Sequence, residues 1–415
     1  MTDPDLFDLP EHLDPAATRA PGGLGGPGAP AVLAAPAVPD PRAEPDPRGG
    51  PDPGPAAEAL ADVSADAGAD ARPPRVVTFG GGHGMYACLS ALRRVTDQLT
   101  AVVTVADDGG SSGRIRGELG GLPPGDLRMA LAALCGDDEW GRTWARALQH
   151  RFAGTGHLAG HALGNLLITA LWEELGDPVA GLDWVARLLG ARGRVLPMSA
   201  VPLEIEATVR GADPAAPDLV GTVRGQHSLA KTPGEVLAVR LLPQDPPAVP
   251  EAVAAIHEAD WVVLGPGSWF TSVLPHLLVP GLAEALTSTK ARRLLILNLA
   301  PQAGETDGFT PADHIDVLLA HAPGLRLDAI LVDPGTLGAA VGGVRRCAGT
   351  AAADEFGPCP ASEEDSVPDG SQSGQLAALA RRVGAEIYCA PVAADGELPY
   401  HDPVLLAEAI RRILR

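Results

Sequence analysis

Short apolar runs and glycine-rich turns alternate along the chain from about residue 76 onward. The runs at 76–79 and 100–106 are each followed by a glycine-rich turn, and the segment 85–94 between them has the composition of a helix. A strand, a glycine turn, a helix and a second strand, in this order, are the parts of a nucleotide-type α/β unit. The segment from Val76 to Arg128 therefore predicts one half of such a fold.

The same pattern returns after residue 260. The segment 261–275 predicts a strand, a glycine turn and the start of a helix, and 292–308 predicts a further strand that ends in a polar loop. Further strands are expected at 327–334 and 385–392, and a helix at the C-terminal end. The stretch from Trp261 to Ala283 has no charged residue, but prolines and glycines interrupt it, which favours a buried parallel strand over a membrane span.

A different periodicity lies between these halves. The segments 203–211 and 219–230 alternate apolar and polar residues around a short polar loop, which predicts an antiparallel hairpin at about 200–240. The expected fold is therefore α/β: a Rossmann-like, doubly wound, mostly parallel sheet with an appended antiparallel hairpin, formed by residues 75–415.

Two segments are expected to lie outside this core. Residues 1–74 hold 16 of the 41 prolines and are acidic, which predicts a disordered extension. The polar segment at about 350–375 predicts a disordered insertion. The first residues lack the apolar core of a signal peptide, and the five cysteines are odd in number with no CxxC pair, so a reducing cytoplasm is expected.

The net charge of the chain limits the kinds of binding partner that we expect. The formal net charge is −21, so binding of nucleic acid by the whole surface is not expected, because such proteins carry basic patches. Any phosphate site must be local. Neither a disulfide framework nor a zinc site is indicated, and a homo-oligomer is left open.

The first glycine turn is the strongest candidate site. Glycines followed by a helix N-terminus suit an anion such as phosphate, although the turn matches neither G-x-G-x-x-G nor the P-loop. A merely tight turn is the alternative. The candidates here are Gly81, Gly82, His83 and Gly84.

Asp107 and Asp108 end the second strand, where an acidic residue often binds a ribose hydroxyl or a metal such as Mg²⁺. Turn chemistry alone is the alternative. The residues that follow supply backbone flexibility, hydroxyls and a guanidinium: Gly109, Gly110, Ser111, Ser112 and Arg114.

Four more polar residues have open roles between 126 and 165. Asp126 is expected either to cap its helix or to join the site together with Arg128. His161 and Asn165 stand at the head of an apolar helix and are either packed there or part of the site. Trp140 and Trp144 have helical spacing and are interpreted as core or groove-lining residues.

The later strands add loops that should converge on the first. In open α/β sheets the ligand lies across the carboxyl ends of the strands. The candidates in these loops are Gly265, Gly267, Ser268, Phe270, Thr271, Asn298, Gln302, Glu305, Thr306 and Asp307.

Taken together, the motifs GGGHG, TVADDGGSSGR, LPPGDLR, GHALGN, VLGPGS and QAGETDG resemble the CofD-like family, over about 75–334. Within this family, the sequences of these motifs are similar to those of the YvcK-type gluconeogenesis-factor branch, which binds UDP-N-acetylglucosamine. The other branch is the 2-phospho-L-lactate transferase of deazaflavin-cofactor synthesis.

The resemblance implies a cytoplasmic UDP-sugar-binding regulator of cell shape and cell-wall precursor flow, rather than an enzyme. The two glycine loops would then cradle phosphates, Asp107 and Asp108 would bind ribose or a divalent ion, and Arg114 and Arg128 would offset phosphate charge. Phe270 or Trp269 would stack on the base. The alternative implies a Mg²⁺-dependent transferase that acts on a guanylylated phospholactate.

Two positions depart from the family pattern. The family commonly reads GGTG where this chain has His83, which places an imidazole beside the expected phosphates. The branch commonly has a tyrosine where this chain has Phe270, so a hydrogen bond from that phenol is missing.

Overall fold

The computed structural model describes residues 72–302, 304–337, 372–396 and 399–415. Nearly all of the extension expected at 1–74, and most of the insertion expected at about 350–375, lie outside the described residues.

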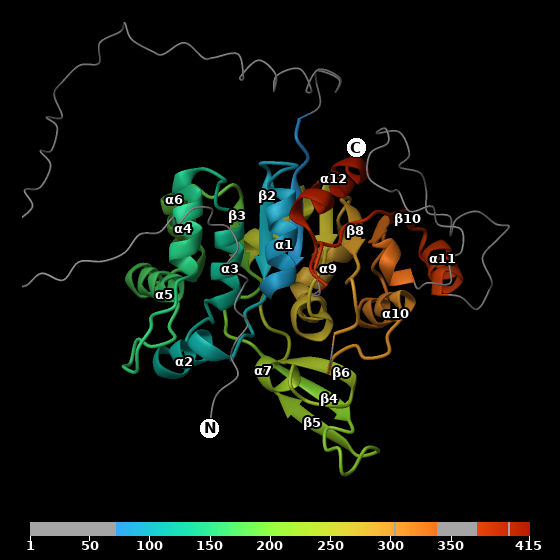
Figure 1. Ribbon diagram of the computed structural model, residues 1–415, viewed down its shortest axis with the longest axis horizontal. Coiled ribbons are helices and arrows are strands. Elements are labelled where there is room, and N and C mark those ends of the chain that lie inside the picture. The colour runs from blue at the N-terminus through green and yellow to red at the C-terminus, as the bar shows by residue number, and fades with distance from the viewer. Residues whose placement is uncertain (1–71, 303, 338–371, 397–398) are drawn as a thin grey trace, which may run out of the picture. The chain divides into compact units, whose positions relative to one another are not determined.

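A seven-stranded sheet forms the centre of the described chain (Figure 1). The strand order is β10-β9-β8-β7-β1-β2-β3, and every neighbouring pair is parallel. The strands are β1 Val76–Gly80, β2 Leu99–Val103, β3 Arg194–Pro197, β7 Trp261–Leu264, β8 Arg292–Ile296, β9 Ala329–Val332 and β10 Glu386–Cys389. The predicted parallel sheet is confirmed.

Burial explains why these strands are visible in the sequence. All residues of β1, β7 and β9 are buried. Strands that are covered on both faces have no polar side to present, so each becomes a continuous apolar run. The uncharged stretch after residue 260 accordingly divides into β7, a glycine turn and short helical segments before α9, Pro280–Ser288.

The direction of the crossovers decides where a ligand can bind. From β1 the chain passes through α1, Gly82–Leu92, to β2 on one side, and from β7 it passes through α9 to β8 on the other. Right-handed crossovers in opposite directions place the two helices on opposite faces of the sheet. The sheet is therefore doubly wound, and its topological switch point lies between β1 and β7.

The remaining helices cover the sheet and its ends. Helix α1 packs against α3, Gly125–Ala133, and against α12, Pro403–Ile413, on one face. The others are α2 Gly110–Leu119, α4 Glu139–Gln149, α5 Leu163–Leu175, α6 Pro178–Leu189, α7 Gln226–Leu229, α8 Pro250–Glu258, α10 Pro311–His321 and α11 Gln372–Val383, with shorter turns η2 Trp269–Val273, η3 Leu274–Leu278 and η4 Pro334–Leu337.

The predicted antiparallel element is confirmed as part of a separate sheet. β4, Glu204–Arg210, pairs antiparallel with β5, Val220–Arg224, and β6, Glu235–Leu242, adds a third strand on the other side of β4. The buried carboxylate of Glu206 pairs with Arg224 and Arg240 from the two outer strands. This charge pairing ties the three strands together.

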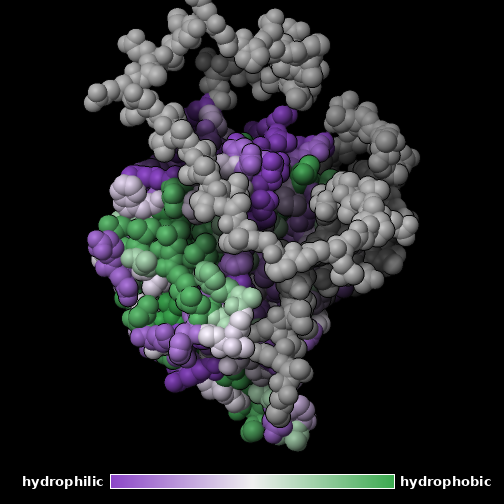
Figure 2. All heavy atoms as spheres, turned by 60° about the vertical axis from the view of Figure 1, so that its left-hand side comes forward, coloured by the Kyte–Doolittle hydropathy of each residue, from purple (hydrophilic) through white to green (hydrophobic). Residues whose placement is uncertain are grey.

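Hydrophobic side chains gather on the face formed by α4, α5 and α6 (Figure 2). Trp140 is 57% exposed there and is therefore not the core residue that was one of the two expectations, whereas Trp144 packs partly against the core. Among the described residues, no helix combines the length and the apolar character that crossing a membrane requires.

Candidate functional site

The two glycine turns meet at the switch point between β1 and β7. Gly84, in the first turn of α1, lies against the turn that follows β7. A Cβ atom on Gly84 would lie 2.6 Å from both the Cα of Gly267 and the carbonyl oxygen of Pro266. No side chain fits in this space, so glycine is required by the close approach of two backbones.

The N-terminus of α1 is partly satisfied at this junction. Gly81 is the N-cap and has no side chain to cap the helix, but the Asp126 carboxyl accepts from the N–H of Gly82. Gly82 has a φ of 59°, a conformation that favours glycine. The other N–H groups of the first turn, and the positive end of the helix dipole, remain available to an anion.

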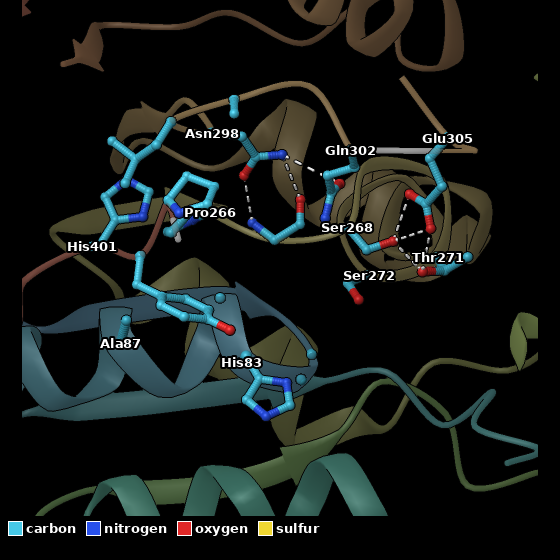
Figure 3. A pocket seen from close by; sticks show the side chains of 18 of the residues that line it. His83, Ala87, Pro266, Ser268, Thr271, Ser272, Asn298, Gln302, Glu305 and His401 are labelled. Atoms are coloured by element: carbon cyan, nitrogen blue, oxygen red, sulfur yellow. Dashed lines mark hydrogen bonds between the residues drawn. The ribbon is translucent and has the colours of Figure 1, made fainter. Parts of the chain in front are cut away.

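A cavity of about 510 Å³ opens beside the two turns (Figure 3). Its walls come from α1, from α7 and its following residue, from the turn after β7, from the loop after β8 and from the segment before α12. The lining residues are Gly81, Gly82, His83, Gly84, Ala87, Gln226, Ala230, Pro266, Gly267, Ser268, Thr271, Ser272, Asn298, Leu299, Ala300, Pro301, Gln302, Glu305, Pro399, Tyr400 and His401.

Side chains after β8 fix the second turn. Asn298 accepts from the N–H of Gly267 at 2.9 Å and donates to its carbonyl oxygen, also at 2.9 Å. Gln302 accepts from the N–H of Trp269 at 3.1 Å. Because these amides already have partners, the turn at 265–268 offers fewer free N–H groups to a phosphate than the turn at 81–84.

Glu305 occupies the start of η2. Its carboxylate accepts from the Ser268 hydroxyl at 2.6 Å, from Thr271 at 3.2 Å and from the N–H of Phe270 at 3.4 Å (Figure 3). The residue is buried, and burial raises the pKa of this carboxyl, although the hydrogen bond from Ser268 opposes the shift. Glu305 thus satisfies the hydrogen-bond donors at this helix end and holds the wall of the cavity in place.

A second polar cluster lies against the first glycine turn. Asp126 accepts from the Thr104 hydroxyl at 2.9 Å, and its Oδ2 lies 2.5 Å from the position that a Cβ on Gly81 would take. Burial, and then the nearby charge of Asp107, raise the pKa of Asp126 to about 7. Asp126 is not the N-cap that was considered, because Pro124 holds that position and α3 begins at Gly125.

Arg128 and Asn165 extend this cluster. Arg128 Nε donates to Asn165 Oδ1 at 2.9 Å, and Asn165 Nδ2 donates to the Ser111 hydroxyl at 3.0 Å. Ser111 also meets His161 Nδ1 at 3.0 Å, and Ser112 lies 3.5 Å from Asn165 Nδ2. These hydrogen bonds connect the predicted segments at 111–112, 128 and 161–165. None of these residues lines the cavity.

Electrostatics links the cluster to the cavity. Removal of water by neighbouring protein atoms, and then the positive charge of Arg128, lower the pKa of His83. The imidazole of His83 therefore favours its neutral form, and the charge of Arg128, which does not line the cavity, acts on the turn at 81–84.

The two adjacent acids point to different partners. Asp107 Oδ1 accepts from the N–H of Gly109 at 3.0 Å, whereas Asp108 Oδ1 accepts from the N–H of His227, beside the small sheet, at 2.8 Å. Within the described ranges, no group of three or more His, Cys, Asp or Glu residues is arranged to hold a metal ion. Binding of Mg²⁺ by Asp107 and Asp108 stays a prediction that their divergence does not favour.

The other predicted residues lie outside the cavity wall. Phe270 and Trp269 are 1% and 0% exposed, so neither presents a ring face to a ligand, because both are packed in the core. Arg114 is exposed and donates to the carbonyl of Ala159. The remainder shape turns: Gly110 and Gly265 have positive φ, Thr306 accepts from the N–H of Gln302, and Asp307 accepts from that of Gly304.

Sequence reasoning missed part of the cavity wall. Gln226 and Ala230 come from the segment that joins β5 to β6, and Tyr400 and His401 come from the chain just before α12. No local motif marks these residues. Gln226 and Ala230 follow β5 of the antiparallel sheet, whereas Tyr400 and His401 follow β10 of the parallel sheet, so only the tertiary structure brings them together.

Comparisons with known proteins agree with this architecture. The family model described as 2-phospho-L-lactate transferase CofD matches residues 76–345. A Mycobacterium leprae protein named "Putative gluconeogenesis factor" is 52% identical over 338 residues, which cover 81% of this chain and 85% of that protein. A Halalkalibacterium halodurans protein named "Gluconeogenesis factor" is 42% identical over 62% of this chain and 76% of its own length.

A solved structure shows the same fold. The crystal structure of a Bacillus halodurans protein of the UPF0052 family superposes with a TM-score of 0.65 at 34% identity, and the match covers 82% of this chain and 99% of that one. With the doubly wound sheet, the glycine turns and these matches in agreement, the chain belongs to the CofD-like family and resembles those members that carry the name gluconeogenesis factor.

Proposed function

We propose that this protein binds a UDP-sugar, UDP-N-acetylglucosamine, in the cavity at the switch point and acts as a cytoplasmic regulator without turning the ligand over. The observation that carries the proposal is the glycine-rich N-terminus of α1 at the edge of a cavity of about 510 Å³. Small-molecule sites in proteins typically have volumes of roughly 300–1,000 Å³.

The lining suits a diphosphate attached to a sugar. Backbone N–H groups of the first turn of α1, apart from that of Gly82, supply the anion site, and the lining residues include neither lysine nor arginine. The buried guanidinium of Arg128 acts electrostatically on His83 in this turn. Side chains such as Ser272 and Gln302 offer donors and acceptors of the kind that sugar hydroxyls need.

The names of similar proteins support the proposed regulatory role. Proteins that cover most of this chain are named gluconeogenesis factors, which describes a role in metabolic control. We infer that ligand occupancy reports the supply of cell-wall precursor and so links growth on gluconeogenic carbon to cell shape. A small-molecule partner fits the local site and the acidic charge of the chain better than nucleic acid does.

Calorimetric titration of the full chain with UDP-N-acetylglucosamine, followed by analysis of the mixture for products, tests this function. We expect saturable binding with the ligand recovered intact. Ala87→Leu, which fills the cavity from α1, should weaken binding at least tenfold. Ala170→Leu, the same change at an exposed position of α5, should not. Absence of heat with the unmodified protein, or equal effects of the two variants, would contradict the proposal.

One arrangement favours a second candidate, a transferase of the phospholactate type. Asp126, whose pKa lies at about 7, sits beside Asp107 and the first glycine turn, and the matching family model carries the transferase description. Paired carboxyls of this kind assist phosphoryl chemistry with Mg²⁺. Mg²⁺-dependent release of GMP from a guanylylated phospholactate would support this candidate against the regulator.

A further inference from the structure

One part of the cavity wall comes from the far end of the chain. Pro399, Tyr400 and His401 line the cavity, although they follow the first glycine turn by more than 300 residues. They also lie beyond the segment 76–345 that matches the family model. The contribution of this segment to the site is therefore not described by that match.

The described structure holds this segment firmly beside α1. Ala393 pairs with His401, and the N–H of Ala394 donates to the carbonyl of Tyr400 at 2.7 Å. Asp402 then caps α12, which packs against α1. Because α1 begins at the glycine turn, the position of Tyr400 and His401 relative to that turn is fixed by helix packing.

Tyr400 presents a ring to the cavity. It is 47% exposed, and it is the only phenylalanine, tyrosine or tryptophan among the lining residues. Trp269 and Phe270 are buried in the core and do not line the cavity. A half-exposed aromatic ring beside a polar cavity is a suitable surface for the flat face of a base.

His401 has an unused hydrogen-bonding atom at the same wall. The residue is 8% exposed, and its Nε2 is buried without a partner. Figure 3 shows the imidazole beside Pro266 at the edge of the cavity. A buried polar atom without a partner is costly, so a ligand atom that pairs with it gains affinity.

The available nitrogen of His401 is an acceptor. Burial lowers the pKa of His401 to about 4, so the ring is neutral near pH 7. The backbone of Leu297 hydrogen-bonds the imidazole, and since Nε2 has no partner, this bond is made by Nδ1. A neutral imidazole that donates from Nδ1 accepts at Nε2. Nε2 therefore selects a ligand with an N–H or O–H donor.

We propose that Tyr400 and His401 form a base-recognising wall: Tyr400 stacks on the base of a bound nucleotide, and His401 Nε2 accepts from a ring N–H such as N3–H of uracil. This inference deepens the proposed function, since it concerns the same cavity. It adds a selection for bases with a ring N–H, as in uracil or guanine, over cytosine, which lacks one at that position.

Titrations of the full chain with UDP, CDP, GDP and inorganic pyrophosphate test the proposal. The unmodified protein should bind UDP at least tenfold more tightly than CDP. Tyr400→Ala should weaken UDP about tenfold or more, as loss of a stacked ring predicts, whereas Tyr400→Phe should stay within about twofold. Pyrophosphate, which has no ring, should bind equally to all variants.

His401 needs its own pair of variants because it is buried. His401→Leu should lose the preference for UDP over CDP, and His401→Gln, whose amide oxygen can take the place of Nε2, should retain part of it. Val404→Ala, an exposed change on α12 outside the cavity, is the matched control. Thermal unfolding of each variant shows whether it is folded.

The outcomes separate this inference from the proposed function. If UDP-N-acetylglucosamine binds and Tyr400→Ala leaves its affinity unchanged, the stacking wall is wrong while the function stands. If GDP binds in a Tyr400-dependent manner and UDP-N-acetylglucosamine does not, the wall stands and the function is wrong. Equal affinity for UDP and CDP overturns the role of His401, and failure of every nucleotide to bind overturns both proposals.

Discussion

Gly84 lies so close to Gly267 that a Cβ on the first would come within 2.6 Å of the Cα of the second. These residues belong to the two turns that follow β1 and β7, the neighbouring strands at which the sheet reverses its winding. The contact therefore sets the distance between the two halves of the site, and its energetic importance can be measured.

Gly84→Ala should destabilise the fold by about 1–3 kcal/mol, because the new methyl group overlaps backbone that cannot move aside easily. Gly117, inside α2, has open space around its Cβ position. Gly117→Ala should be neutral or stabilise by about 0.5–1 kcal/mol. Urea denaturation of both variants measures the difference in the free energy of unfolding. Equal stabilities of the two variants would show that the turns at 81–84 and 265–268 can move apart at little cost.

Asp126 should make stability fall as pH rises. Its pKa is raised from 3.8 to about 7, so the folded protein keeps a proton that the unfolded chain has already released. Unfolding is then increasingly favoured as pH increases through this interval. Asp126→Asn should flatten this part of the profile, whereas Asp97→Asn, at an exposed position, should not. Denaturation midpoints between pH 4 and pH 8 provide the measurement, and a slope retained in Asp126→Asn would exclude this residue as its source.

Glu305→Ala should cost about 1–3 kcal/mol, because donors at Ser268, Thr271 and Phe270 lose their acceptor in a buried place. Glu305→Gln keeps one acceptor oxygen and should cost less. Glu284→Ala, at an exposed position on α9, controls for loss of a carboxylate. If Glu305→Ala and Glu284→Ala had the same midpoint of thermal unfolding, the proposed stabilisation of η2 by Glu305 would be incorrect.

The tryptophans should differ strongly in their contributions. Trp269 is fully buried and packs edge-on to His314, so Trp269→Ala should destabilise the protein by about 3–5 kcal/mol. Trp140 is 57% exposed, and Trp140→Ala should cost less than about 1 kcal/mol. Guanidinium unfolding followed by circular dichroism compares them. A large loss at Trp140 would instead indicate that the apolar face of α4–α6 is covered in solution.

The candidate site was predictable where its residues lie close in sequence. The turn at 81–84 and the turn at 265–268 each follow a continuous apolar run, and the rule that ligands bind at the carboxyl ends of parallel strands brings them together. Asn298 and Gln302 could be chosen for the same reason. Phe270 could not be assigned correctly, because whether an aromatic ring faces a cavity or the core depends on what packs against its helical turn.

The sequence by itself determined the strand, glycine-turn and helix units and their order, since these depend on local patterns of burial and on backbone freedom at glycine. Tertiary structure alone decided which distant segments share the cavity. Asp107 and Asp108 are adjacent in sequence but accept hydrogen bonds from different segments. Tyr400 lines the same cavity as the turn at 81–84, although most of the chain separates them in sequence. These contacts between distant segments follow from the strand order and from the packing of α12 on α1. Both are properties of the whole fold rather than of any one segment.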